Sequence, residues 1–377
     1  SASVAGTVVK DKTTPKPGDS KSAPKEGEEG GNYGVGVSAN VSINTIQDEI
    51  IAAIKEAALE SKSTRISSGN YTQVIAVGGT VAIVTKEGTS AALSGAYAQN
   101  TITNVNKATI DDSDLVLSGD LSLEAESSEK IIDVSASGSG STSSDSVSVA
   151  GQVSVNIISS LTEASVLNQA NLQAHHITIT ATEKSSILAI AGALAYGGKA
   201  GIGASVAWNQ IRSVDNPEKA GAVTAYIKDS DVKALGDITL KADSTNDILA
   251  VTVAAGASQE GMAAALSVSM NIIDADTQAY IIGKKSVGID ADGAITLEAI
   301  NQSSILAVAG NVTYSKTSSI GVAGSYNEIS GTIKAHIGEE NILETIVKAD
   351  SLSIEALSAA YIFSVSAGGS ISSGQAA

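Results

Sequence analysis

The fold of this chain is decided by a stretch that reads Ile320-Gly321-Val322-Ala323-Gly324-Ser325-Tyr326-Asn327-Glu328-Ile329, followed eight residues after the Asn by Ala335-His336-Ile337. An Asn with Ile two places later recurs in similar small-residue surroundings at Asn44, Asn100, Asn156, Asn209, Asn271 and Asn327. Successive copies lie 56, 56, 53, 62 and 56 residues apart. A period near this length predicts stacked equivalent units with one continuous core.

Within a copy, short alternating segments indicate β-strands. Ile295–Ala299 alternates apolar and polar residues, Ser304–Gly310 is a longer apolar segment, and Ser315–Ser319 is a polar turn. The opening segment recurs at Leu121–Ala125, Ile177–Ala181, Ile238–Ala242 and Leu352–Ala356. We therefore predict an all-β parallel β-solenoid in which each copy has a long two-strand arm ending in a variable tip. Residues 1–377 form one continuous array of about six repeats, divided near 64, 120, 176, 237, 294 and 351.

Two segments depart from the repeat. Residues 11–32 contain three of the four Pro, together with many charged and small residues, and we predict a disordered loop inserted at one tip, with a domain linker as the alternative. Residues 47–62 have the composition and apolar spacing of a helix, yet Ala52, Ile54 and Leu59 fall at strand positions of the repeat. The sequence leaves helix and strand both open there.

Composition excludes several classes of partner. The formal net charge is −17, which argues against binding to nucleic acid or to anionic membrane surfaces. No Cys is present, so disulfides and Cys-based metal sites are excluded. The longest nearly uncharged stretch, Ile187 to Trp208, has a Gly-rich centre that marks a turn between strands, so we expect no membrane insertion.

The first and last copies are incomplete in this sequence. Ser3-Val4-Ala5-Gly6 matches Ala307-Val308-Ala309-Gly310, and the last segment stops near the tip of the same hairpin. Uncapped β-stacks expose edges that self-associate. We therefore expect the partner of this array to be itself, either as further coils of a longer chain or as copies joined end to end.

The repeat resembles those of very large bacterial surface proteins of the filamentous-adhesin and leukotoxin-like type. The resemblance is carried by Ala204-Ser205-Val206-Ala207-Trp208-Asn209-Gln210-Ile211, then Ala225-Tyr226-Ile227, then Gly236-Asp237-Ile238-Thr239-Leu240, and it covers nearly the whole chain. It implies an exported, extracellular β-helical protein on the bacterial cell surface. The family brings no catalytic residue onto this sequence.

The six Asn are the candidate site residues. Identical amides in stacked strands can hydrogen-bond to one another as a ladder. The alternative is that each Asn serves a turn or a strand end without such contacts. We predict a structural ladder of Asn44, Asn100, Asn156, Asn209, Asn271 and Asn327.

The remaining candidate residues point neither to a metal site nor to catalysis. His175 and His176, if on a strand, would point to opposite faces and not share a metal, and the acidic clusters lack the loop that binds calcium in β-rolls. The Tyr and Trp residues near strand ends are expected to fill corners of the core. We expect no catalytic residue, no metal and no cofactor.

The function expected from the sequence is structural: a non-catalytic extracellular stalk or filament that supports adhesion or cell–cell contact through stacked repeats. An adhesin that binds a host protein or glycan directly by its loops is the alternative. A β-helix enzyme that cleaves polysaccharides is a further alternative, but an acidic substrate would need a basic groove, and the chain has only two Arg.

Overall fold

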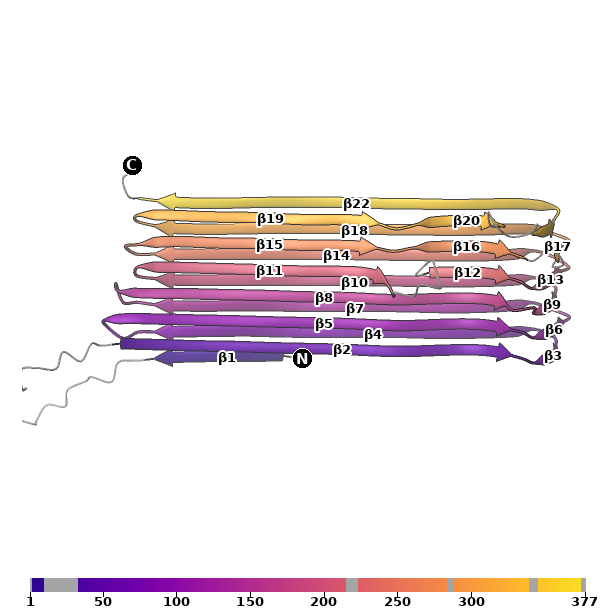
Figure 1. The fold of residues 1–377 in the computed structure, drawn as a ribbon, viewed down its shortest axis with the longest axis horizontal. Helices are drawn as coiled ribbons and strands as arrows, with labels where there is room; N and C mark the ends of the chain where they lie inside the picture. The colour runs from indigo at the N-terminus through magenta and orange to yellow at the C-terminus, as the bar shows by residue number, and fades with distance from the viewer. Residues whose placement is uncertain (1, 10–32, 215–222, 284–287, 339–344, 374–377) are drawn as a thin grey trace, which may run out of the picture.

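A computed structural model describes residues 2–9, 33–214, 223–283, 288–338 and 345–373. The predicted loop 11–32 lies outside these residues. The described chain consists of parallel strands in three sheets, so the prediction of an all-β parallel solenoid is confirmed. Each coil runs out along the first sheet, turns, returns along the second, and crosses the third to reach the next coil (Figure 1).

The first sheet, sheet A, has one long strand per coil. Its strands are β1 (Ala2–Val9), β4 (Thr64–Val84), β7 (Leu121–Ser141), β10 (Ile177–Gly197), β14 (Ile238–Ser258), β18 (Ala294–Ser315) and β22 (Ser351–Ser372). The two strands expected at 295–310 are therefore one uninterrupted strand. Twenty-one residues, the length of β7, extend about 70 Å at about 3.3 Å per residue, so the coils are much longer than they are thick.

The second sheet, sheet B, returns beneath sheet A. Its strands are β2 (Tyr33–Lys55), β5 (Thr89–Asp111), β8 (Ser146–Leu167), β11 (Ala200–Ser213), β12 (Val223–Lys228), β15 (Met262–Asp274), β16 (Thr277–Ile282), β19 (Ser318–Ser330) and β20 (Ile333–Ile337). The first three coils use one unbroken strand, and the later coils divide it in two. The tips are the A-to-B turns, at residues 85–88, 142–145, 198–199, 259–261 and 316–317.

The third sheet, sheet C, closes the end of each coil that lies opposite the tips (Figure 1). Its short strands are β3 (Ala58–Ser61), β6 (Asp114–Leu117), β9 (Asn171–Ala174), β13 (Asp231–Ala234), β17 (Gly288–Ala291) and β21 (Ile346–Lys348). We call this end of the coil, with the adjoining halves of sheets A and B, the body.

The segment with helix-like composition is strand. Residues up to Lys55 belong to β2, which pairs with β5 in register from Tyr33↔Thr89 to Lys55↔Asp111. Glu56 then adopts a positive φ of 47°, and β3 follows. Pairing along a 23-residue neighbour outweighs the helical preference of the local sequence.

The interior changes character along each coil. In the body, stacked Leu, Ile, Val and Ala side chains form the main apolar core. A second, smaller cluster of mainly Ile lies nearer the tips, and includes Ile131, Ile158 and Ile187. From there to the tips the same strand faces stay inward, but they carry Ala, Ser, Gly, Thr, Asn or Gln, with Asp133 and Val84 as exceptions among the described coils.

The outer faces change in the opposite sense. In β7 the outward residues of the body half are polar, such as Glu124 and Lys130, whereas those of the tip half include Ile132 and Val134. The strand has no bulge between the halves, because its pairing with β10 continues residue by residue from Leu121↔Ile177 to Gly140↔Tyr196. The tip half is thus apolar outside and largely polar or small inside.

Candidate functional site

The structure brings all six repeat Asn into one column along sheet B, at the boundary between the two halves of the coil. Each side-chain nitrogen donates to the side-chain oxygen of the next copy: Asn44 to Asn100 at 2.7 Å, Asn100 to Asn156 at 2.8 Å, Asn156 to Asn209 at 2.9 Å, Asn209 to Asn271 at 2.8 Å, and Asn271 to Asn327 at 2.8 Å. The four inner members are fully buried. The spacing between neighbouring coils lets each amide reach the next one, so these buried polar groups satisfy one another's hydrogen bonds.

Serine hydroxyls two residues earlier support the ladder. Asn156 also donates to Ser154 at 3.0 Å, and Asn327 donates to Ser325 at 3.0 Å. Position −2 is Ala in two coils, Ala98 and Ala207. The ladder therefore stands without this second contact, and its geometry is that of a structural column rather than of a ligand site.

A buried carboxylate pair lies between the two apolar clusters. Glu129 and Glu183 are both about 1% exposed, and Ser185 contacts one oxygen of each at 3.1 Å. Asn104 donates to Glu129 at 3.1 Å, and Ser160 donates to Glu183 at 2.6 Å. Burial, with the nearby Glu129 carboxylate, raises the pKa of Glu183 to about 8, and burial also raises the pKa of Glu129. The neutral carboxyl is therefore the favoured form of Glu183 below about pH 8.

An aromatic stack crosses three coils on sheet B. The rings of Tyr226 and Tyr280 are 4.8 Å apart, and those of Tyr280 and His336 are 5.3 Å apart. The hydroxyl of Tyr226 donates to buried Glu163 at 2.6 Å. Burial and the Glu163 carboxylate raise the pKa of Tyr226, so this hydroxyl stays protonated and serves as a fixed donor.

The expectation that His175 and His176 cannot share a metal assumes that both lie on a strand, and the structure has no strand there. They lie in the turn between β9 and β10, not on a strand, and their ring centroids are 4.4 Å apart. Donor atoms of Asp120, His175 and His176 lie within 4.8 Å of one another. These three residues are therefore the ones that could hold a metal ion among the described residues. However, the backbone N–H of Asp237 donates to Nδ1 of His176 at 3.0 Å, and a metal at that atom would have to displace the bond.

The acidic loop clusters serve turns. Asp112 and Asp229 adopt positive φ values of 44° and 51°. Ser113 and Ser230, which follow them, are buried and donate to the backbone oxygens of Asp111 and Lys228. Asp, Ser and Asn suit such positions because their short polar side chains bond to nearby backbone groups.

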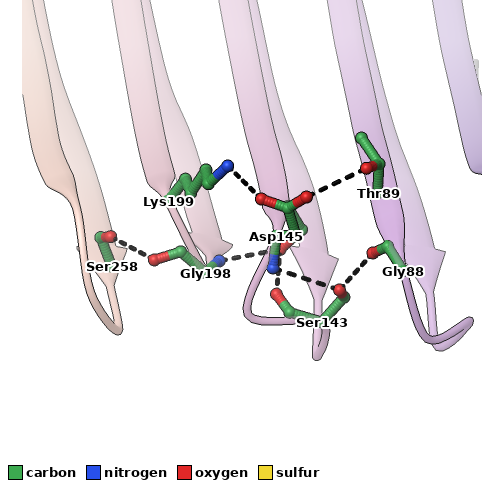
Figure 2. A network of polar contacts seen from close by, with 8 residues as sticks. Gly88, Thr89, Ser143, Asp145, Gly198, Lys199 and Ser258 are labelled. Atoms are coloured by element: carbon green, nitrogen blue, oxygen red, sulfur yellow. Dashed lines mark hydrogen bonds and ion pairs between the residues drawn. The ribbon is translucent and has the colours of Figure 1, made fainter.

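Polar contacts at the tips join neighbouring coils (Figure 2). The carboxylate of Asp145 contacts Lys199 of the next coil and accepts from Thr89 of the preceding coil at 3.0 Å. Lys199 is the main reason why the pKa of Asp145 is lowered. Ser143 donates to the carbonyl of Gly88, and Ser258 donates to that of Gly198 at 2.7 Å. The tips thus form a charged, cross-linked rim.

Most aromatic residues near strand ends do not fill the core, contrary to the prediction. Tyr226 is buried, but Trp208 is 45% exposed and Tyr361 is 61% exposed. Tyr196, Tyr314 and Tyr326 are also exposed. Successive side chains of a strand point to opposite faces, and these residues occupy outward positions. They are therefore exposed although their rings are apolar.

Depressions on the described surface are open rather than enclosed. One of about 260 Å³ lies over sheet C and is lined by residues such as Asn171, Lys233 and Ile346. No helix of the described residues is long and apolar enough to cross a membrane. Comparison of the chain with protein families, with curated proteins and with solved structures finds no match.

Proposed function

We propose that this chain is a structural, non-catalytic part of an extracellular stalk or filament of a bacterial cell surface, which supports adhesion or cell–cell contact through its stacked coils. The observation that carries the proposal is the unbroken axial column of contacts. Sheets A, B and C keep one register from coil to coil, and the Asn ladder follows it through all six copies. Mechanical continuity along the stack is what such an arrangement supplies.

The placement of polar chemistry supports a structural role. Glu129 and Glu183 are sealed inside the coil, and Glu163 is engaged by Tyr226. The described surface depressions are open. The resemblance of the repeats to those of filamentous adhesins points the same way.

The end coils of the described stack are the joining surfaces in this proposal. The edges of β22 and β19 at one end, and of β2 at the other, each have a hydrogen-bonded neighbour on one side only among the described strands. A parallel strand in the same register would continue each sheet, whether it comes from further coils of the same chain or from another copy.

The test combines the mass of the native molecule with the assembly of the purified chain. A denatured mass far above that of this chain would identify a continuous stalk. A mass near that of the chain, together with elongated particles in electron micrographs, would identify a self-stacking subunit. Ser366→Pro in edge strand β22 should then block growth, because Pro cannot join a sheet ladder, whereas Ser186→Glu on the outer face of inner strand β10 should not. A mass near that of the chain with no stacking would refute the proposal.

A further inference from the structure

The tip half of the stack carries an apolar belt on both of its broad outer faces. On sheet A the belt comprises the outward positions in register with residues 75, 77, 79, 81 and 83 of β4. On sheet B it comprises those in register with residues 35, 37, 39, 41 and 43 of β2. Across the described coils these positions hold Val, Ile, Leu, Met, Ala, Gly and aromatic residues, with Gln99 and Ser318 as the polar exceptions and no charged residue.

Large side chains stack in columns within this belt. One column on sheet A consists of Ile75, Ile132, Leu188, Leu249, Leu306 and Phe363. One on sheet B consists of Val37, Leu93, Val149, Ile202, Ala264 and Ile320. Such columns produce continuous exposed apolar surface, which soluble proteins rarely leave uncovered.

The two faces of the belt lie at the same height along the coil. Gln152 of sheet B donates to Ser135 of sheet A, and Ser154 donates to Asp133, which places these strand segments opposite each other. The outward neighbours of both segments, Val153 and Val134 among them, belong to the belt. A partner with one docking surface would cover one face, whereas the belt needs an apolar medium on both.

The length of the belt fits one such medium. Nine residues of strand, from Ile75 to Ile83, extend about 30 Å at about 3.3 Å per residue. The hydrocarbon core of a lipid bilayer is also about 30 Å thick. The belt ends at polar zones on both sides: the rim with Asp145 and Lys199 at the tips, and Lys130 and Asp247 on the body side.

Aromatic residues, all of them exposed except the half-buried Tyr97, mark both ends of the belt. Tyr33, Tyr196 and Tyr314 lie beside the tips, and Tyr71, Tyr97, Trp208, Tyr326 and Tyr361 lie at or near the body-side limit. Tyr and Trp prefer the boundary between hydrocarbon and water, because they combine an apolar ring with a polar group. Eight of the ten Tyr and Trp residues therefore sit at the two levels where a bilayer would have its interfaces.

From these observations we propose that the tip half of the solenoid inserts into a lipid bilayer, with the belt in the hydrocarbon and the charged tips on the far side. The inner strands are hydrogen-bonded on both edges, so their backbone groups are satisfied in hydrocarbon. Among the described strands, only the outermost ones keep a free edge, and the energetic cost of these two edges per coil falls as the stack lengthens. The inward Ser, Thr and Asn side chains lie between sheets A and B, away from lipid.

The proposal replaces the expectation of no membrane insertion. The nearly uncharged stretch Ile187 to Trp208 contains a turn, as predicted, but this turn is the tip that carries Lys199. Both strands that it joins, β10 and β11, carry belt positions. The stretch thus forms the belt of one coil: β10 runs through the belt to the tip, and β11 returns through it.

The absence of native Cys permits a direct test on the full chain. Leu194→Cys lies in the belt and is 59% exposed before substitution, and Thr178→Cys is an exposed control on the body half of the same strand. Each variant is labelled with an environment-sensitive fluorophore and mixed with phosphatidylcholine vesicles, with and without bromine on the acyl chains. We expect a blue shift and bromine quenching at position 194 but not at position 178.

A charge in the belt provides the second arm. Leu194→Lys should reduce co-flotation with the vesicles roughly tenfold to a hundredfold, because an ammonium group is costly in hydrocarbon, whereas Thr178→Lys should leave it unchanged. Circular dichroism checks that both variants keep their strand content. Quenching absent at position 194, or equal at both positions, would overturn the proposal. Blue-shifted emission before lipid is added, unchanged by lipid, would also overturn it and would show that another copy covers the belt.

Discussion

The inner amides of the Asn ladder have no water to replace a lost partner. Asn156→Ala would leave the Asn100 donor and the Asn209 acceptor unpaired inside the stack. An orphaned buried polar group costs about 1–3 kcal/mol, so we expect the substitution to lower the free energy of unfolding by roughly 2–4 kcal/mol. The matched control is Asn44→Ala at the end of the ladder, which leaves only one buried group, the Asn100 oxygen, without its partner and should cost about half as much, roughly 1–2 kcal/mol. Denaturant unfolding measures both, and equal losses would show that the ladder is not the source of the effect.

Glu183 makes stability depend on pH. Its pKa rises from the ordinary value of 4.5 to about 8 on folding, so between these values the folded chain holds a proton that the unfolded chain releases. The contribution is fully present below pH 4.5 and is lost as the pH rises through about 8, by an amount on the order of a few kcal/mol. Glu183→Gln, which keeps the neutral shape, should flatten the fall of the melting temperature with pH over this window. Glu124→Gln on the outer face of β7 should leave the fall unchanged, and a wild-type curve without this slope would contradict the burial argument.

At the scale of elements, the short strands of sheet C are anchored by an inward column of large apolar side chains. Leu172 of β9 stacks between Leu115 and Val232 and is about 1% exposed. Leu172→Ala should cost roughly 2–5 kcal/mol, because the neighbouring coils fix the cavity walls. Gln173→Ala, which removes an outward side chain of the same strand, should change stability by less than about 0.5 kcal/mol in the same denaturant experiment. Similar losses for the two variants would mean that β9 is held by its backbone pairing alone.

The elements also show how far sequence reasoning reaches. The spacing of the Asn residues is enough to predict the register and the ladder, because stacked coils place equivalent residues side by side. It does not decide segment 47–62, where pairing with β5 overrides local helical preference. It misplaces His175 and His176, because a two-residue turn between β9 and β10 has no Gly or Pro to mark it.

The apolar belt was missed for a different reason. Alternation of apolar and polar residues indicates that a strand has two unlike faces, but it does not say which face lies inside. The usual assumption is that the apolar face points inward. The signal is present in β10, where the aliphatic residues change parity without a bulge. Ile177 and Ile179 are inward and buried, whereas Leu188, Ile190 and Leu194 belong to the outward set. A change of parity within one long strand therefore predicts an inverted half.

At the scale of the whole molecule, the coil is the unit that the stack can gain or lose. Deleting residues 121–176 removes one complete coil and joins Asp120 to Ile177, the residue that pairs with Leu121. Asn100 would then face Asn209, so the ladder and all three sheets can close over the deletion. We expect this variant to keep its strand content per residue and a melting temperature close to that of the full chain, because each coil contacts mainly its neighbours. Deleting residues 121–148 instead removes a sheet A strand and a tip but leaves most of β8, which should expose unpaired strands and cause aggregation. If the whole-coil deletion unfolds as completely as the half-coil deletion, the coils are not equivalent units, and the stack is held by contacts that reach beyond nearest neighbours.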